Sequence, residues 1–231
     1  MPERLLRLVV CALTAAVVLA ACGDAERPVR QDPVDWAHEA SDLPPDPAVT
    51  FGVLPNGMRY AILPNDTPSD AVSVRFALNA GSLLEEEDQR GLAHFVEHMA
   101  FNGTTNVPEG EMVQLLERYG LAFGADTNAS TSFDFVSYRL DVPGADEERL
   151  KAALFLMRET ASELLFEPQA IEDERGIILG EERFRNTPIL RYQDAYLRFL
   201  FPRTIIPERM PIGLVEVVRE APRERFVDYY R

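Results

Sequence analysis

Alternating apolar and polar residues predict two strands in the body of this chain. Over residues 71–82 the segment AVSVRFALNAGS has four apolar residues on one face, namely Val72, Val74, Phe76 and Leu78. The segment SFDFVSYRLDV alternates in the same way, and the residues expected on its buried face are Val136, Tyr138, Leu140 and Val142. A period of two is typical of a strand with one buried face. Earlier in the chain, two short apolar runs flank the turn sequence PNG at residues 55–57, which predicts a β-hairpin.

Apolar residues recur at helical spacing in the rest of the chain. The expected helices cover residues 89–101, 109–119, 146–165 and 168–185. The acids at residues 85–88 precede the first of these helices, where the helix dipole favours negative charge. The residues after 190 predict two or three further helical pieces broken by prolines. Strands followed by helices, without an internal repeat, predict an α+β fold in which helices flank an antiparallel sheet.

The composition narrows the possible functions. Of the 231 residues, 46% are hydrophobic and 26% are charged, which is typical of one globular domain. The formal net charge of −15 argues against nucleic acid as a partner and against a basic patch that docks on an anionic bilayer. Both cysteines, Cys11 and Cys22, lie near the N-terminus. A metal bound in the body of the chain would therefore need His, Asp or Glu ligands.

The N-terminus has the pattern of an export signal. Arg4 and Arg7 precede an apolar stretch over residues 8–21 that is short for a membrane span. The stretch ends in Leu-Ala-Ala-Cys, which resembles the lipobox of bacterial lipoproteins, and this resemblance implies that Cys22 is lipidated. The alternative is a plain secretory signal that is cut near Ala21.

The residues after this signal predict the domain organisation. Residues 22–47 are polar and dotted with prolines, which is typical of a flexible tether, and His38 within them is expected to be solvated. A folded domain is then expected over residues 48–231. Glycine rather than aspartate follows Cys22, so no residue there signals retention in the inner membrane. The lipid-anchored chain is therefore expected in the bacterial cell envelope, on the periplasmic face of the outer membrane.

Two of the three histidines lie four residues apart, in the segment GLAHFVEHMAFNG. On a helix, His94 and His98 share one face, and Glu97 joins that face. Two imidazoles placed in this way can bind one zinc ion, and the adjacent glutamate can act as general base toward a water molecule. The order H-x-x-E-H is the inverted form of the H-E-x-x-H zinc-protease motif.

Zinc needs a third ligand, and one predicted helix limits the choice of carboxylates. In EPQAIEDERGIILGEERFR, five residues form one stripe, namely Ile171, Glu174, Ile178, Glu181 and Arg185. The two isoleucines imply that this stripe faces inward, where a carboxylate needs a partner. Glu174 and Glu181 lie about 10 Å apart along the axis, so both cannot bind one ion directly. The alternative is that arginines such as Arg175 or Arg183 neutralise the two glutamates, and the periodicity leaves this choice open.

Four segments together resemble the M16 (pitrilysin-like) zinc metallopeptidases. They are LPNGMRYAIL, GSLLEEEDQRGLAHFVEHMAFNGTTN, FGADTNASTSFDFVSYRLDV and EDERGIILGEE, and the resemblance covers nearly all of the chain from about Val49. It is closest to a branch of bacterial periplasmic proteins and lipoproteins. The resemblance implies the M16/LuxS-type metallohydrolase fold and one Zn²⁺ per chain.

The resemblance also implies roles for single residues. His94 and His98 would be zinc ligands and Glu97 the general base. The family pattern has a glutamate that binds zinc seven residues after another glutamate, which matches Glu181 as third ligand and Glu174 as an acid that supports the site. Asn128 and Ala129 match the Asn-Ala stretch of the edge strand that pairs with extended substrate, whereas a turn before a strand is their alternative interpretation.

Members of this family usually pair two homologous halves, or two subunits, around an enclosed chamber. After FVDYYR such proteins continue into further strands, so the peptidase domain of residues 48–231 is expected to be incomplete. The favoured function is a zinc endopeptidase, or its metal-bearing N-terminal portion, that hydrolyses peptides or unfolded polypeptides. The alternatives are a lipoprotein that binds peptide without cutting it and an inactive fragment.

Overall fold

The computed structural model describes residues 36–121, 127–144 and 146–231. The described residues fall into two compact units, one that ends at Asn65 and one that covers Asp66–Arg231. The predicted signal segment, Cys22 and most of the predicted tether lie outside the described residues. Within the described ranges, the helices lack the combination of length and apolar character that crossing a bilayer requires.

The first unit contains the predicted β-hairpin. Strands β1 (Thr50–Val53) and β2 (Arg59–Ile62) are antiparallel, with Phe51 opposite Ala61. Gly57 adopts φ 84° in the connecting turn, a conformation that glycine adopts at little cost. The 3₁₀ helix η1 (Ala37–Ala40) carries His38, whose ring packs 4.6 Å from that of Phe51. The expectation of a fully solvated His38 was therefore wrong, since this histidine is half-buried against an aromatic ring.

The second unit is built on a three-stranded antiparallel sheet in the order β3-β5-β4. Its strands are β3 (Ala71–Leu78), β4 (Thr127–Thr131) and β5 (Val136–Pro143). The inner face predicted for β5 is confirmed, because Val136, Tyr138, Leu140 and Val142 are all buried. On β3 the four predicted apolar positions are half-buried, and the residues between them are exposed. The predicted α+β class with an antiparallel sheet is thus confirmed.

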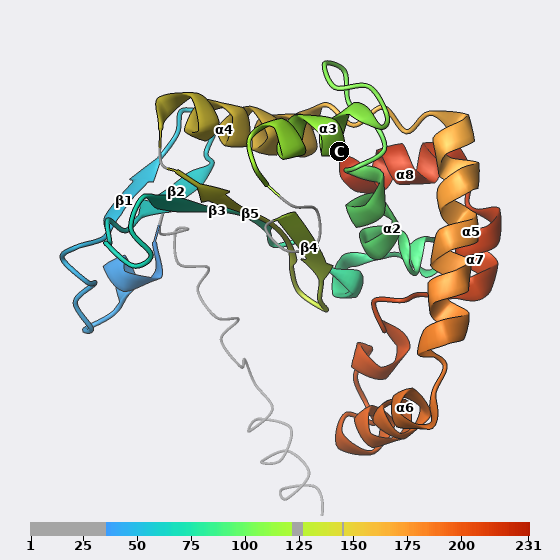
Figure 1. Ribbon diagram of the computed structural model, residues 1–231. Helices are drawn as coiled ribbons and strands as arrows, with labels where there is room; N and C mark the ends of the chain where they lie inside the picture. The colour runs from blue at the N-terminus through green and yellow to red at the C-terminus, as the bar shows by residue number, and fades with distance from the viewer. Residues whose placement is uncertain (1–35, 122–126, 145) are drawn as a thin grey trace, which may run out of the picture. The chain divides into compact units, whose positions relative to one another are not determined.

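Helices follow and flank the sheet (Figure 1). Their bounds are α2 (Leu92–Met99), α3 (Glu111–Arg118), α4 (Glu147–Ser162), α5 (Pro168–Arg185), α6 (Pro188–Leu200), α7 (Val215–Glu220) and α8 (Arg223–Tyr230). Short 3₁₀ helices are η2 (Ser82–Leu84), η3 (Glu87–Gln89) and η4 (Ile206–Glu208). Helix α5 has the predicted bounds despite its two glycines. Helix α2 begins later than predicted, because Gly91 adopts φ 105° immediately before it and separates it from η3.

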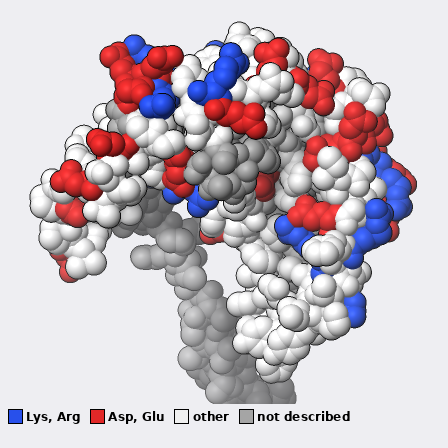
Figure 2. Space-filling view, viewed as in Figure 1, with Lys and Arg blue, Asp and Glu red and all other residues white. Residues whose placement is uncertain are grey.

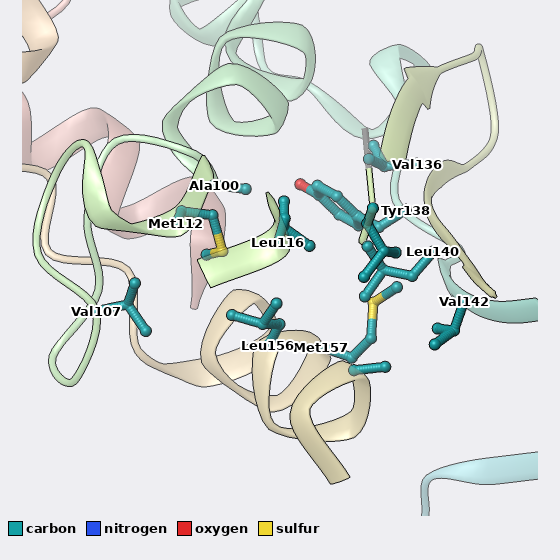
Figure 3. Packing of buried hydrophobic residues seen from close by; sticks show 12 residues of the cluster. Ala100, Val107, Met112, Leu116, Val136, Tyr138, Leu140, Val142, Leu156 and Met157 are labelled. Carbon is teal, nitrogen blue, oxygen red and sulfur yellow. The ribbon is translucent and has the colours of Figure 1, made fainter. Parts of the chain in front are cut away.

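Two apolar clusters stabilise the second unit. The first lies between the sheet and helices α3 and α4, where Met112, Leu116, Leu156 and Met157 pack toward Tyr138 of β5 (Figure 3). The second surrounds α2 and includes Leu92, Phe95, Phe166, Ile178 and Phe226 from α2, α5, α8 and a loop. Helix α2 also contacts β4, so it lies between the sheet and α5 (Figure 1).

Helix α6 belongs to neither cluster. None of its residues is buried, and Ile189 and Phe199 are each 78% exposed. In the space-filling view the surface around α6 is largely uncharged, whereas acidic and basic side chains are interspersed over the helices above it (Figure 2). The helices and the strand with the most contacts to α2 are α5, α8 and β4, and α6 is not among them.

A close contact between two glycines fixes the chain where α2 begins. Gly213 adopts φ 75°, and a Cβ at this position would lie 2.2 Å from the Cα of Gly91. Beside this contact the amide of Leu214 donates to the carbonyl oxygen of Arg90 at 3.2 Å. The guanidinium of Arg209 pairs with Glu87 at 2.6 Å. The segment before α7 is therefore tied to the start of α2.

A buried carboxyl group lies beside the same end of α2. Glu85 is 4% exposed, and its Oε1 accepts a hydrogen bond from the amide of Ala93 at 2.9 Å. Gly91 has no side chain to cap the helix, so Glu85 satisfies one of the first-turn amides instead. Of the acids at residues 85–88, Glu85 is the one whose carboxyl group contacts a first-turn amide of α2. Burial raises the pKa of Glu85 from its ordinary value of 4.5 to about 7.

Replacing Gly213 with alanine is expected to lower the free energy of unfolding by about 3 kcal/mol or more. The added methyl group would clash with the backbone of Gly91, and alanine would also be strained in the left-handed conformation of this position. Gly110→Ala is the matched control, since Gly110 has φ 79° but nothing within 4 Å of the methyl group that alanine would add. The control should lose only about 1–2 kcal/mol through the left-handed backbone. Urea unfolding of both variants measures the difference, and equal losses would contradict the close contact.

Glu85 is expected to make the zinc-free protein less stable as the pH rises. Its raised pKa means that the folded state binds the proton more tightly than the unfolded state does. This contribution is complete below pH 4.5 and is lost as the pH passes through about 7. Between pH 5 and pH 8 the free energy of unfolding should fall by about 2–3 kcal/mol through the loss of this contribution. Glu85→Gln keeps the acceptor for Ala93 and should remove this part of the slope in chelator-treated protein. An unchanged slope would contradict the assignment.

Candidate zinc site

Helix α2 presents two imidazoles toward α5. His94 and His98 lie on one helical face, with ring centroids 4.7 Å apart and ring planes inclined by 79°. The helix is buried along most of its length, because leucine, phenylalanine and methionine side chains occupy its other faces. The two rings are therefore held in fixed positions by the packing of their neighbours.

Glu181 of α5 lies opposite both rings. Its Oε2 is 3.5 Å from Nε2 of His94 and 3.6 Å from Nε2 of His98. Two ligand atoms that bind one tetrahedral zinc ion at about 2.0–2.2 Å lie about 3.4 Å apart. His94, His98 and Glu181 can also each offer a ligand atom within 4.8 Å of the others. The donor set and its spacing thus fit one zinc ion.

Glu174 supports His98 from the side away from Glu181. Its Oε1 is 2.7 Å from Nδ1 of His98, and its Oε2 accepts a hydrogen bond from the side-chain amide of Asn102 at 2.6 Å. When Nδ1 of His98 donates to this carboxylate, Nε2 carries the lone pair that a metal needs. Burial alone would raise the pKa of Glu174, but the hydrogen bonds from His98 and Asn102 lower it below its usual value.

The two imidazoles differ in their affinity for a proton. Burial, together with the charge of His98, lowers the pKa of His94 to about 3. Burial would also lower the pKa of His98, but its hydrogen bond to Glu174 raises that pKa above its usual value. In the described part of the chain, Nδ1 of His94 is buried without a hydrogen-bond partner. His94 is therefore neutral at physiological pH and available as a ligand.

Glu97 lies beside the two imidazoles without joining the ligand set. It is 8% exposed, and the hydroxyl of Thr131, at the end of β4, donates a hydrogen bond to its Oε2. Burial raises the pKa of Glu97, and the hydrogen bond from Thr131 opposes this shift. A buried carboxylate with a raised pKa is better suited to accept a proton near neutral pH than an exposed one.

Arg185 pairs with the oxygen of Glu181 that faces away from the histidines. The guanidinium contacts Oε1, while Oε2 is directed toward the imidazoles. The sequence alternative, in which Arg175 or Arg183 neutralises the glutamates, does not describe these contacts. Arg175 instead pairs with Glu172 at 2.9 Å. The inward stripe on α5 is confirmed for its first three residues, since Ile171, Glu174 and Ile178 are buried, whereas Glu181 is half-buried and Arg185 is exposed.

Asn128 and Ala129 lie in strand β4, not in a turn. Asn128 is exposed and Ala129 is half-buried. One edge of β4 pairs with β5, and within the described ranges no strand pairs with the other edge. The bond from Thr131 to Glu97 brings the end of this strand to the site.

Three residues of the site were not assigned from the sequence. Asn102 lies beyond the end of α2 and of the predicted helix, so helical spacing did not assign it to the face of His94 and His98. Arg185 follows Glu181 by four residues on the predicted stripe, and this spacing carried a signal. Thr131 had no such signal, because its contact with Glu97 depends on how β4 lies against α2.

Comparison with known proteins supports the resemblance to the M16 family that the sequence motifs indicated. Residues 60–187, more than half of the chain, match the family described as Insulinase (Peptidase family M16). The chain is 35% identical over 190 residues to a Haemophilus influenzae protein named "Probable zinc protease PqqL". That alignment covers 82% of this chain and 20% of the relative, so the chain spans about a fifth of the relative's length.

Solved structures show the same similarity. The first half of the periplasmic protease PqqL from Escherichia coli superposes with a TM-score of 0.79 at 36% identity, covering 81% of this chain and 40% of that one. A mutant of the ferredoxin protease FusC, in complex with Arabidopsis ferredoxin, gives a TM-score of 0.73 at 27% identity and covers 79% of this chain and 20% of that one. Both the sequence match and the fold place this chain in the peptidase family M16.

Proposed function

We propose that this chain is the metal-bearing portion of a zinc-dependent endopeptidase. The observation that carries the proposal is the meeting of Glu181 with His94 and His98, whose ligand atoms have the spacing of one zinc site. Glu97 beside them supplies a general base. The relatives named zinc proteases support the same reaction class.

The roles of the side chains follow from their contacts. Zinc, when bound, polarises a scissile carbonyl group and lowers the pKa of a water molecule. Glu97 removes the proton from that water and later donates it to the leaving amine. Thr131 holds the carboxylate of Glu97 in place, and Glu174 fixes the orientation of the His98 ring. Glu97 thus acts as the general base and Glu174 as a support for His98, and the contacts of each carboxylate determine its role.

The substrate is an extended peptide or unfolded polypeptide. Asn128 and Ala129 lie on a strand with one unpaired edge in the described structure, and such an edge can add a substrate strand through backbone hydrogen bonds. The hydrogen bond between Thr131 and Glu97 links this strand to the general base. A substrate along β4 would therefore run toward the zinc site.

The partners and location are extensions of the family membership. The chain spans only a fifth of its relatives, so we expect a second M16 half or subunit to complete the substrate chamber. The Escherichia coli relative is described as periplasmic. Together with the predicted export signal, this supports the proposal of a place in the bacterial cell envelope, with Cys22 as a lipid anchor on the periplasmic face of the outer membrane.

Glu97→Gln should keep the zinc and lose cleavage. The amide preserves the size of the side chain but cannot take the proton of water, so the cleavage rate of an unstructured peptide should fall by at least about 100-fold. Metal analysis and peptide cleavage, with and without chelator, test both parts.

If the wild-type chain carries zinc and binds peptide without cutting it, the peptide-binding alternative replaces the peptidase. Absence of a cooperative unfolding transition would favour the inactive fragment.

Substitutions on α5 should weaken zinc binding in a set order. Glu181→Gln removes a charged ligand and should raise the zinc Kd by more than about 100-fold, whereas Glu174→Gln acts through His98 and should raise it about 10–100-fold. Glu182→Gln is the matched control, since Glu182 is adjacent in sequence but outside the ligand cluster. Competition with a chromophoric chelator measures all three. Equal effects of Glu181→Gln and Glu182→Gln would refute the ligand set.

A further inference from the structure

A buried arginine lies directly beside Glu174 in sequence. Arg175 is 8% exposed, and its guanidinium donates to three oxygens. Nε binds the carboxylate of Glu172 at 2.9 Å, while Nη1 and Nη2 bind the carbonyl oxygens of Val218 and Ala221, each at 2.5 Å. Only one of these partners lies on α5, so the side chain connects α5 to the end of α7.

The carbonyl groups at the end of α7 need an outside donor. In a continuing helix, the amide four residues later would bind the carbonyl of Val218, but residue 222 is a proline and has no amide hydrogen. Ala221 follows the last residue of α7, where helical carbonyl groups have no partner within the helix. Arg175 satisfies both oxygens, and its positive charge lies at the negative end of the helix.

The same guanidinium also reaches α2. Its Cζ lies 5.9 Å from the ring centroid of Phe95 and 5.7 Å from that of Phe226. The two rings meet edge to face with centroids 4.6 Å apart, and both side chains are fully buried. Phe95 is the residue after His94. Arg175 therefore contacts a neighbour of a proposed zinc ligand and is itself the neighbour of Glu174.

We propose that Arg175 is a positioning residue that sets the distance between α2 and α5, and with it the spacing of the zinc ligands. The inference rests on the zinc site of the proposed function. The guanidinium of Arg175 contacts three helices at once. It binds Glu172 on α5, two carbonyl groups at the end of α7, and the face of Phe95 on α2. The ligands of the site are divided between α2 and α5, so a small change in their separation alters the distances from Glu181 to both rings.

A general contribution to stability must be separated from positioning. Arg223 provides the comparison, because it also binds two carbonyl oxygens, those of Phe166 at 2.8 Å and Leu165 at 3.0 Å. These contacts tie α8 to the loop before α5 and involve neither a zinc-site residue nor its neighbour. Arg223→Met should therefore lower the thermal stability without changing the site.

The experiment compares the full wild-type chain with Arg175→Met, Arg175→Lys and Arg223→Met. Zinc Kd values are measured by chelator competition at a temperature at which circular dichroism shows each protein folded. The visible absorption spectrum of bound cobalt(II) reports the ligand arrangement. Arg175→Met should raise the zinc Kd at least 10-fold and alter the cobalt spectrum. Arg175→Lys restores the charge but not the fork of donors, so its Kd should lie between those of wild type and Arg175→Met.

The control should keep both its zinc Kd, within twofold, and its cobalt spectrum. If Arg175→Met does not fold, Arg175→Lys takes its place, with a threefold rise in Kd as the smallest supporting change. A folded Arg175→Met whose zinc Kd rises less than 10-fold would overturn the proposal, as would a rise of less than threefold in Arg175→Lys where only that variant folds, or an equal loss in Arg223→Met. A wild-type chain that binds no zinc would instead overturn the proposed function.

Discussion

The packing of α2 against α5 is the constraint on which the rest of this structure depends. Each helix carries part of the ligand set, His94 and His98 on one and Glu181 on the other. Neither helix can assemble the site alone, because two turns of α5 separate its two inward glutamates. The sheet, α8 and the segment before α7 all contact α2 and limit where it can lie. The fold can thus be understood as a support that holds two helices at one separation.

Apart from Nδ1 of His94, the buried polar groups of the site described above are tolerated because each has a partner. Two imidazoles and several carboxylates within a mostly buried region would otherwise destabilise the protein. Glu174 is held ionised by hydrogen bonds from His98 and Asn102, whereas burial favours the protonated form of Glu97. Carboxyl groups on neighbouring elements thereby have opposite pKa shifts, which is a common way to separate a supporting acid from a proton acceptor.

Much of this arrangement could be predicted from the sequence, because periodic patterns encode it. The alternation of β5 and the inward stripe of α5 depend on which residues are apolar, and the structure confirms the first in full and the second from Ile171 to Ile178. The bounds of α2 were predicted less well, because the left-handed conformation of Gly91 ends the preceding turn. The contact of Thr131 with Glu97 could not be predicted, since no local pattern specifies how an edge strand meets a helix. His38 was misassigned for the same reason, since its partner Phe51 lies in another element.

Several partners of α2 come late in the sequence, and this has a consequence for the order in which the molecule can form. The residues that complete the surroundings of α2, from Arg209 to Phe226, leave the ribosome long after His94 and His98. The contacts of Phe95 with Phe226 and of Arg175 with Val218 and Ala221 therefore cannot form until this later segment has emerged, and contacts between residues so far apart in sequence form slowly in folding. Until then the apolar face of α2 lies open, and a chaperone or another unfolded chain can compete for it.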